Sequence, residues 1–252
     1  MSYSKQSYRT IIETAIELNY EFVDFLTLNL DSPVKQIILR HDIDYSLPQA
    51  LEIAKIDAGY KIKSTFALLI SSPLYNPFTS SNIGVINKIR QLGHSIALHH
   101  RVALVQTAEQ TSQSISREMQ VMKIFFPYIQ PVFVWHNPPS NNLLSDIEVL
   151  GMVNAYGNTF VANMHYVSDS VLRNKPEDIL AALNNPRLVH LLLHPIVWMS
   201  EKNNIVSMFA SALSDIINEC DNEYSTNPVW KRKFPKGIPE EILNKLEAQL
   251  ND

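Results

Sequence analysis

The stretch IILRHDIDYS, residues 37–46, changes from apolar to charged within a few positions. Its first part, IILR, has the continuous apolar character of a strand buried in a parallel sheet. His41, Asp42 and Asp44 follow at once, so three ionisable side chains stand where the predicted strand ends. The stretch is therefore interpreted either as a polar loop or as the floor of an active site.

Short apolar runs alternate with longer helical patterns on both sides of this stretch. The apolar runs predict strands at residues 35–39, 63–70, 95–99, 131–135, 159–162, 165–167 and 187–193. Patterns with a helical period predict helices at residues 47–60, 80–93, 107–126, 143–149, 175–183 and 201–220. A tail with Pro228, Pro235 and Pro239 is predicted to wrap the body before a short final helix. Strands that alternate with helices indicate an α/β fold with a parallel sheet, open or closed into a barrel.

Length and composition agree with such a fold. The chain has 252 residues, which is ordinary for a single α/β barrel. Hydrophobic residues make up 46% and charged residues 18%, so a sizeable core can form and disorder is not expected. Neither G-x-G-x-x-G nor G-x-x-x-x-G-K-[ST] occurs, and the sequence therefore lacks the phosphate loops of Rossmann and P-loop proteins.

Charge and cysteine content restrict the partners and the compartment. The formal net charge is −4 and the only basic cluster is WKRKFPK, residues 230–236, so no nucleic-acid partner is expected. Cys220 is the only cysteine, which excludes an intramolecular disulfide and fits a reducing compartment. Residues 1–10 are polar and unlike a secretory signal, and no apolar run approaches the roughly 20 residues of a transmembrane helix. We expect a soluble cytoplasmic protein; its oligomeric state is left open.

Five of the strand-like runs end in chemically capable side chains. In a parallel barrel the carboxyl ends of all strands converge on one face, which carries the active site. We therefore expect these strand ends to meet in one pocket. The residues concerned are His41, Asp42 and Asp44 after the first run, then His99 and His100, His136 and Asn137, Asp169, and His194.

Asp42 and Asp44 are two positions apart, so an extended backbone points both carboxylates the same way. They repel each other unless a cation lies between them or one stays protonated. A divalent metal with a carboxylate and one or two imidazoles resolves the repulsion and lowers the pKa of bound water to about 7. The second carboxylate can then act as general base, and a histidine across the pocket as general acid. This pattern is typical of a metal-assisted hydrolase.

The same residues resemble the polysaccharide deacetylases, carbohydrate esterase family four, over about residues 35–200. The resemblance is greatest to a cytoplasmic branch found with surface-polysaccharide (O-antigen or capsule) biosynthesis. As a set in this order the motifs are specific, whereas each one alone is weak. They are LRHDIDYS (39–46), STFALL (64–69) with YNP (75–77), GHSIALHH (93–100), FVWHNPP (133–139), YVSDS (166–170) and LLLHPIVW (191–198).

The resemblance implies both a fold and a set of roles. The fold would be a distorted (β/α) barrel of about seven parallel strands, with residues 1–252 as one domain and a C-terminal helix and tail from residue 201. Asp42 would be the general base and His194 the general acid. Asp44 and His99 would bind the metal, most often zinc.

The third metal ligand departs from the family pattern. Four residues beyond His99, where many members have a second histidine, stands Ala103, and Arg101 occupies the place where the closer branch often has an acidic residue. His136, from another strand end, is the better substitute. His100 is adjacent to His99 but would face the other side of a strand.

Other polar residues near the strand ends are predicted to contact substrate. His100 could instead be structural, Asp169 could orient a catalytic group or cap a turn, and Trp198 could stack on a sugar or pack as a lid. Arg101 would favour an anionic substrate such as a uronate or nucleotide sugar. The predicted substrate-binding set is His41, His100, Arg101, Asn137, Asp169 and Trp198.

The leading functional hypothesis is a metal-dependent hydrolase that removes an acetyl or related acyl group from a sugar. Its substrate would be a cytoplasmic nucleotide-linked or lipid-linked sugar. The alternative is a metal-free relative that binds a sugar intermediate or a partner enzyme, or that acts on another amide. Ala103 and Arg101 motivate this alternative.

Overall fold

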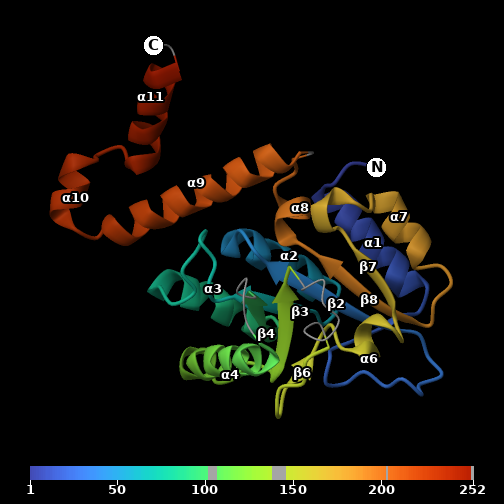
Figure 1. The fold of residues 1–252 in the computed structure, drawn as a ribbon. Coiled ribbons are helices and arrows are strands. Elements are labelled where there is room, and N and C mark those ends of the chain that lie inside the picture. Colours follow the sequence, from blue (N-terminus) through green and yellow to red (C-terminus); the bar gives the residue numbers. More distant parts are fainter. Residues whose placement is uncertain (102–106, 138–145, 203, 251–252) are drawn as a thin grey trace.

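The computed structural model describes residues 1–101, 107–137, 146–202 and 204–250. Within them a parallel sheet curls into an open, distorted barrel with the strand order β6-β5-β4-β3-β2-β8-β7, and β1 also pairs with β2 (Figure 1). The predicted fold class is thus confirmed. The strands are β1 (Glu21–Val23), β2 (Gln36–Ile43), β3 (Thr65–Leu69), β4 (Ser95–Arg101), β5 (Val132–His136), β6 (Val153–Asn154), β7 (His165–Ser168) and β8 (Leu188–Leu193).

Helices surround this sheet and extend the chain beyond it (Figure 1). Those of the first half are α1 (Lys5–Glu17), α2 (Leu47–Gly59), α3 (Ser80–Gln91) and α4 (Ala108–Phe125). Those of the second half are α6 (Asn158–Val161), the 3₁₀ turn η1 (Ser170–Leu172), α7 (Pro176–Ala182), α8 (Pro195–Met199), α9 (Ile205–Tyr224), α10 (Pro228–Lys233) and α11 (Ile238–Leu250).

Strand β2 lies at the centre of the sheet, and all eight of its residues are buried. It pairs with β8 along one edge and with β1 and then β3 along the other. Successive side chains alternate between the two faces. Ile38 belongs to the small apolar cluster inside the barrel, whereas Leu39 and Ile43 belong to the large cluster under the helices. The strand therefore includes His41 and Asp42 and ends at Ile43, directly before Asp44.

The large apolar cluster holds the helices on the sheet. The helix predicted at residues 107–126 is present as α4, and its Ile115, Met119 and Met122, which have helical spacing, are buried in this cluster. Burial of each such side chain contributes about 1.5–3 kcal/mol. The interior cluster is smaller and includes Ala67 and Ala97, which leaves room inside the barrel for polar side chains near the strand ends.

Three expectations about individual elements are wrong. Residues 158–161 form helix α6 instead of a strand, since Phe160 turns inward to pack on Phe25 with ring centroids 5.0 Å apart. The tail does not wrap the body, because α10 and α11 lead away from the sheet and α11 packs on α9 (Figure 1). Residues 146–149 are not helical, and residues 143–145 of the predicted helix lie outside the described residues.

Helix α1 and strand β1 were not predicted, although α1 contributes Tyr8, Ile11 and Ile12 to the core. Among the helices that the structure describes, each is too short or too polar to cross a bilayer.

Candidate metal centre and active site

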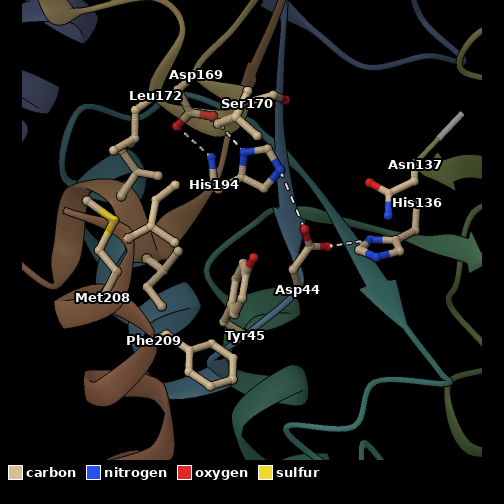
Figure 2. A pocket seen from close by; sticks show the side chains of 14 residues that line it. Asp44, Tyr45, His136, Asn137, Asp169, Ser170, Leu172, His194, Met208 and Phe209 are labelled. Carbon is tan, nitrogen blue, oxygen red and sulfur yellow. Dashed lines mark hydrogen bonds and ion pairs between the residues drawn. The ribbon is translucent and has the colours of Figure 1, made fainter.

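The candidate site lies where the parallel strands end. Asp44 follows β2, His99 lies near the end of β4, His136 ends β5 and His194 follows β8. Because the strands are parallel, their carboxyl ends lie at one edge of the barrel, and the four side chains converge there. Figure 2 shows Asp44, His136 and His194 at this edge. The structure thus brings these four of the predicted residues together.

Three of these side chains bring one ligand atom each to a common point. Oδ1 of Asp44 lies 3.0 Å from Nε2 of His99 and 3.1 Å from Nδ1 of His136, and the two nitrogens are 3.3 Å apart. In a tetrahedral site with bonds of about 2.0–2.2 Å, ligand atoms lie roughly 3.3–3.6 Å apart. The observed spacing is close to that range, so these atoms could hold a metal ion.

The orientation of His99 bears on this assignment. Its Nδ1 lies 3.2 Å from the carbonyl oxygen of Val134, which can only accept a hydrogen bond. A proton therefore sits on Nδ1, and Nε2 is the ring nitrogen left to bind a metal ion. This nitrogen faces the carboxylate of Asp44. A carboxylate with two imidazole nitrogens suits zinc or a similar divalent ion. The residues present therefore fit a metal ion.

Asp44 is held in its charged form. Burial alone would raise the pKa of its carboxyl, but the contacts from His136 and His99 and the positive charge of nearby histidines outweigh burial. The pKa of Asp44 therefore lies well below its usual value. A permanently charged carboxylate is what a metal ligand requires.

The ligand atoms of Asp44, His99 and His136 form a three-donor cluster. Asp42 lies beside this cluster but makes different contacts. Its Oδ2 is 3.7 Å from Nε2 of His99. Arg40 donates from Nε to Oδ1 at 2.9 Å and from Nη2 to Oδ2 at 3.1 Å, a bidentate ion pair between two buried side chains. Burial would lower the pKa of Arg40, but the Asp42 carboxylate and the nearby Tyr156 raise it above its usual value. This pair fixes the Asp42 carboxylate at the edge of the cluster.

Sequence reasoning treated Arg40 only as the end of an apolar strand. The available signal was its spacing, because residues two apart on a strand share a face and Arg40 stands two before Asp42. What the spacing could not show is the rest of the arginine's environment. Its Nη1 lies 3.1 Å from Nε2 of His190, and its Nη2 donates to the Tyr156 hydroxyl at 3.0 Å.

His194 faces Asp44 from the opposite side of the site, with Nε2 3.6 Å from Oδ2. Asp169 holds the ring from behind, since its Oδ1 lies 2.6 Å from Nδ1 of His194. Oδ2 of Asp169 accepts from the backbone N–H of His194 at 2.9 Å and from Nε1 of Trp198 at 2.8 Å. Burial would lower the pKa of His194, but the carboxylates of Asp169 and Asp44 raise it to about 9. His194 is thus held as an imidazolium and can donate a proton.

A pocket of about 240 Å³ opens from these side chains (Figure 2). Asp44, His136, Asn137, Asp169 and His194 line it, as expected from the strand ends. Its other lining residues were not predicted, because most of them are apolar and come from η1, α8 and α9. These are Tyr45, Ser170, Val171, Leu172, Ile196, Val197, Ile205, Met208 and Phe209.

Four residues of the predicted substrate-binding set lie elsewhere. His41 is buried on the outer face of β2, with Nε2 3.1 Å from Oδ2 of Asp57. His100 is buried against α4, with Nδ1 2.7 Å from Oε2 of Glu118. Arg101 is exposed at the end of β4 and does not line the pocket.

Trp198 is the fourth. It is fully buried and packs on Tyr3 and Tyr8, with ring centroids 5.5 and 6.0 Å away. It therefore cannot stack on a sugar, and its only polar contact in the described structure is with Asp169. Ala103, where a third metal ligand was expected, lies outside the described residues.

Comparison with known proteins supports the fold. No protein-family model and no curated protein matches the sequence. Among solved structures, the Streptococcus pyogenes deacetylase PplD in complex with acetate matches with a TM-score of 0.50 and 10% identity, over 72% of this chain and 87% of that one. The Bacillus subtilis peptidoglycan deacetylase PdaC matches with a TM-score of 0.46 and 18% identity, over 77% and 87%.

A mutant of the Bacillus anthracis protein BA3943, described as a CE4 family pseudoenzyme with restored enzymatic activity, matches with a TM-score of 0.42 and 15% identity. That match covers 73% of this chain, which spans only 64% of the length of BA3943. At such low identity the likeness to these proteins concerns the fold.

Proposed function

We propose that the protein is a metal-dependent hydrolase that removes an acyl group from the amino nitrogen of a sugar. The observation that carries this proposal is the placement of three kinds of group around one point at the carboxyl edge of the sheet. A three-donor cluster stands beside a carboxylate fixed by an arginine, and an imidazolium fixed by a second carboxylate faces them. These are the parts that amide hydrolysis requires.

Asp44, His99 and His136 would hold the ion, which when bound polarises the substrate carbonyl and favours ionisation of water. Asp42 accepts the proton of the attacking water as the water oxygen bonds to the carbonyl carbon. The carbon–nitrogen bond then breaks, and His194 gives its proton to the leaving nitrogen. The products are a carboxylic acid and a free amine. Arg40 and Asp169 keep the base and the acid in place.

The finer assignments rest on the family resemblance of the motifs. By that resemblance the ion is zinc and the acyl group is acetyl or a close relative. The sugar is a nucleotide-linked or lipid-linked cytoplasmic intermediate of surface-polysaccharide biosynthesis. The departure at the third ligand is compatible with this proposal, because His136 brings its Nδ1 to the position where a ligand is needed.

Adjacent histidines on β4 provide a matched test of the metal site. His99→Ala should weaken zinc binding by more than about 100-fold, because one of three ligands is lost. His100→Ala removes the same side chain from the opposite face and should leave zinc binding unchanged. Zinc per chain, measured by atomic emission on protein purified without chelator, distinguishes the two.

Asp42→Asn tests the chemistry separately. It should lower the turnover of an N-acylated amino sugar by about 10²–10⁴-fold while zinc content stays near that of the wild type. Retained turnover in this variant would remove Asp42 from the proposed mechanism. Protein that contains no metal but still binds the sugar would favour the non-hydrolytic alternative.

A further inference from the structure

The pocket beside the candidate site has two unlike sides. Asp44, His136 and Asn137 form a polar side, whereas the opposite wall is apolar (Figure 2). The apolar wall is built from the η1 turn, α8 and α9. Its members are Leu172, Ile196, Val197, Ile205, Met208 and Phe209.

Packing within the fold holds the side chains of this wall in place. Ile196, Val197 and Met208 are buried in the large apolar cluster, so their positions are fixed by packing. Phe209 is held at the rim by an edge contact with Tyr45, with ring centroids 6.3 Å apart. None of the six side chains carries a hydrogen-bond donor, and the weakly accepting thioether sulfur of Met208 is their only acceptor.

The turn that brings Leu172 to the pocket has an unusual backbone. Val171 and Leu172 have φ of 50° and 55°, a region that side chains larger than glycine rarely adopt. Two consecutive outliers of this kind, one at a β-branched residue, are typical of ligand-binding segments held in place by their surroundings. They follow Asp169, the residue that fixes His194.

We infer that this wall binds the alkyl chain of an acyl group longer than acetyl. The inference rests on the proposed function, and it names the class of substrate. The wall extends over six apolar side chains of a pocket of about 240 Å³, and it offers more apolar surface than one methyl group can cover. The substrate class is an amino sugar whose nitrogen carries a linear acyl chain of several carbons.

A sugar ring is a poorer occupant of this wall than an alkyl chain. Its hydroxyl groups would lose water without gaining a protein partner among the six side chains. Each methylene group placed there is instead worth up to about fourfold in binding. The sugar therefore lies toward the polar side and Asn137, and the chain lies against Met208 and its neighbours.

The inference predicts that rate depends on chain length. From N-acetyl- to N-butyrylglucosamine, kcat/KM should rise about tenfold, since two methylene groups are added. Ile205→Gln and Met208→Gln should each reduce that advantage at least threefold, measured within each variant as the ratio of kcat/KM for the butyryl substrate to kcat/KM for the acetyl substrate. Val206→Gln is the matched control, because Val206 follows Ile205 in the first turn of α9, is 80% exposed and does not line the pocket.

A binding measurement separates failure of this inference from failure of the proposed function. Calorimetry with acetate, butyrate and hexanoate should show affinity that increases with chain length in the wild type and not in Ile205→Gln. If no N-acyl sugar of any length is hydrolysed, the proposed function fails, and the subsite is still judged by this binding series. Equal affinity for all three carboxylates, or equal kcat/KM for all chain lengths, would overturn the subsite.

Discussion

Arg40 and Asp42 show how one residue can determine the state of another. Both side chains are almost fully buried, at 0% and 3% exposure. Each supplies the opposite charge that the other needs in this buried place. Removing two charges from water is costly, and a buried pair rarely adds net stability. Breaking such a pair is costly as well, because one charge is left without compensation. We therefore assign to Arg40 the role of fixing the Asp42 carboxylate.

At this scale we predict the result of a double-mutant cycle. Arg40→Met should lower the free energy of unfolding by about 3–5 kcal/mol, because the Asp42 charge is left buried and unpaired. Adding Asp42→Asn to Arg40→Met should recover part of that loss, a coupling that urea unfolding at pH 7 measures. Arg90→Met, at an exposed arginine, is the control and should change stability by less than about 0.5 kcal/mol. A loss below about 1 kcal/mol in Arg40→Met would contradict this account.

The position of a side chain could be predicted from the sequence when its surroundings are formed by residues close to it in the chain. His99 and His100 are neighbours on one strand, and alternation alone predicted that they face opposite sides. Trp198 could not be decided, because the residues that bury it are Tyr3 and Tyr8, almost two hundred positions earlier. The same holds for Met208 and Ile205, whose place in the pocket depends on how α9 packs.

Among the elements, β2 has two faces with different tasks. The inner face carries Arg40 and Asp42, and the outer face carries His41 in a buried polar network. Tyr8 donates a hydrogen bond to Oδ1 of Asp57, and Ser64 donates to Oδ2 of the same carboxylate at 2.7 Å. This network joins α1, α2 and β2, and it lies across the sheet from the candidate site.

We predict that the outer face contributes stability and not metal binding. Tyr8→Phe leaves Asp57 with one donor fewer in a buried place and should lower the free energy of unfolding by about 1–3 kcal/mol. Zinc content should be unchanged, because none of the candidate metal ligands Asp44, His99 and His136 moves. Tyr60→Phe, which removes a hydroxyl that bonds Glu13 at the surface at 2.6 Å, is the control and should cost less than about 0.5 kcal/mol. Loss of zinc from Tyr8→Phe would show that the two faces are coupled.

Elements were predictable where their pattern was strong and local. The strands of the sheet core and the helices predicted at residues 47–60 and 107–126 followed from the periodicity of apolar positions. Residues 159–162 were mistaken for a strand, because a segment of four residues is too short to distinguish a helical from a strand period. Helix α1 was missed although its buried positions Tyr8, Ile11, Ile12 and Ala15 have helical spacing.

Across the whole molecule the two edges of the sheet differ in composition. The carboxyl edge holds the candidate site. At the opposite edge, the Asp24 carboxylate bonds to residues at the amino ends of β3, β4 and β5. This carboxylate accepts from Nζ of Lys63 at 2.6 Å, from Nε2 of Gln130 at 2.7 Å and from the Ser95 hydroxyl at 3.2 Å. In barrels of parallel strands, the edge away from the site typically serves stability.

The pH dependence of stability should therefore report on Asp24. Burial alone would raise the pKa of its carboxyl, but Lys63, Gln130 and Thr27 outweigh burial and hold that pKa well below its usual value. A carboxyl whose pKa is lower in the folded state contributes stability above its unfolded pKa of about 3.9, and loses that contribution as pH falls toward the folded value.

Asp24→Asn removes this contribution. It should lower the free energy of unfolding by about 1–3 kcal/mol at pH 7, since Lys63 is partly exposed and the remaining bonds are to neutral groups. The difference from the wild type should be the same at pH 7 and pH 5 and should shrink at pH 3, because Asp24 in the unfolded wild-type chain begins to take up a proton there while the folded carboxyl stays ionised. Urea unfolding at the three pH values measures it, with the exposed Asp31→Asn as control. A difference that stays constant to pH 3 would mean that the charge of Asp24 does not stabilise this edge.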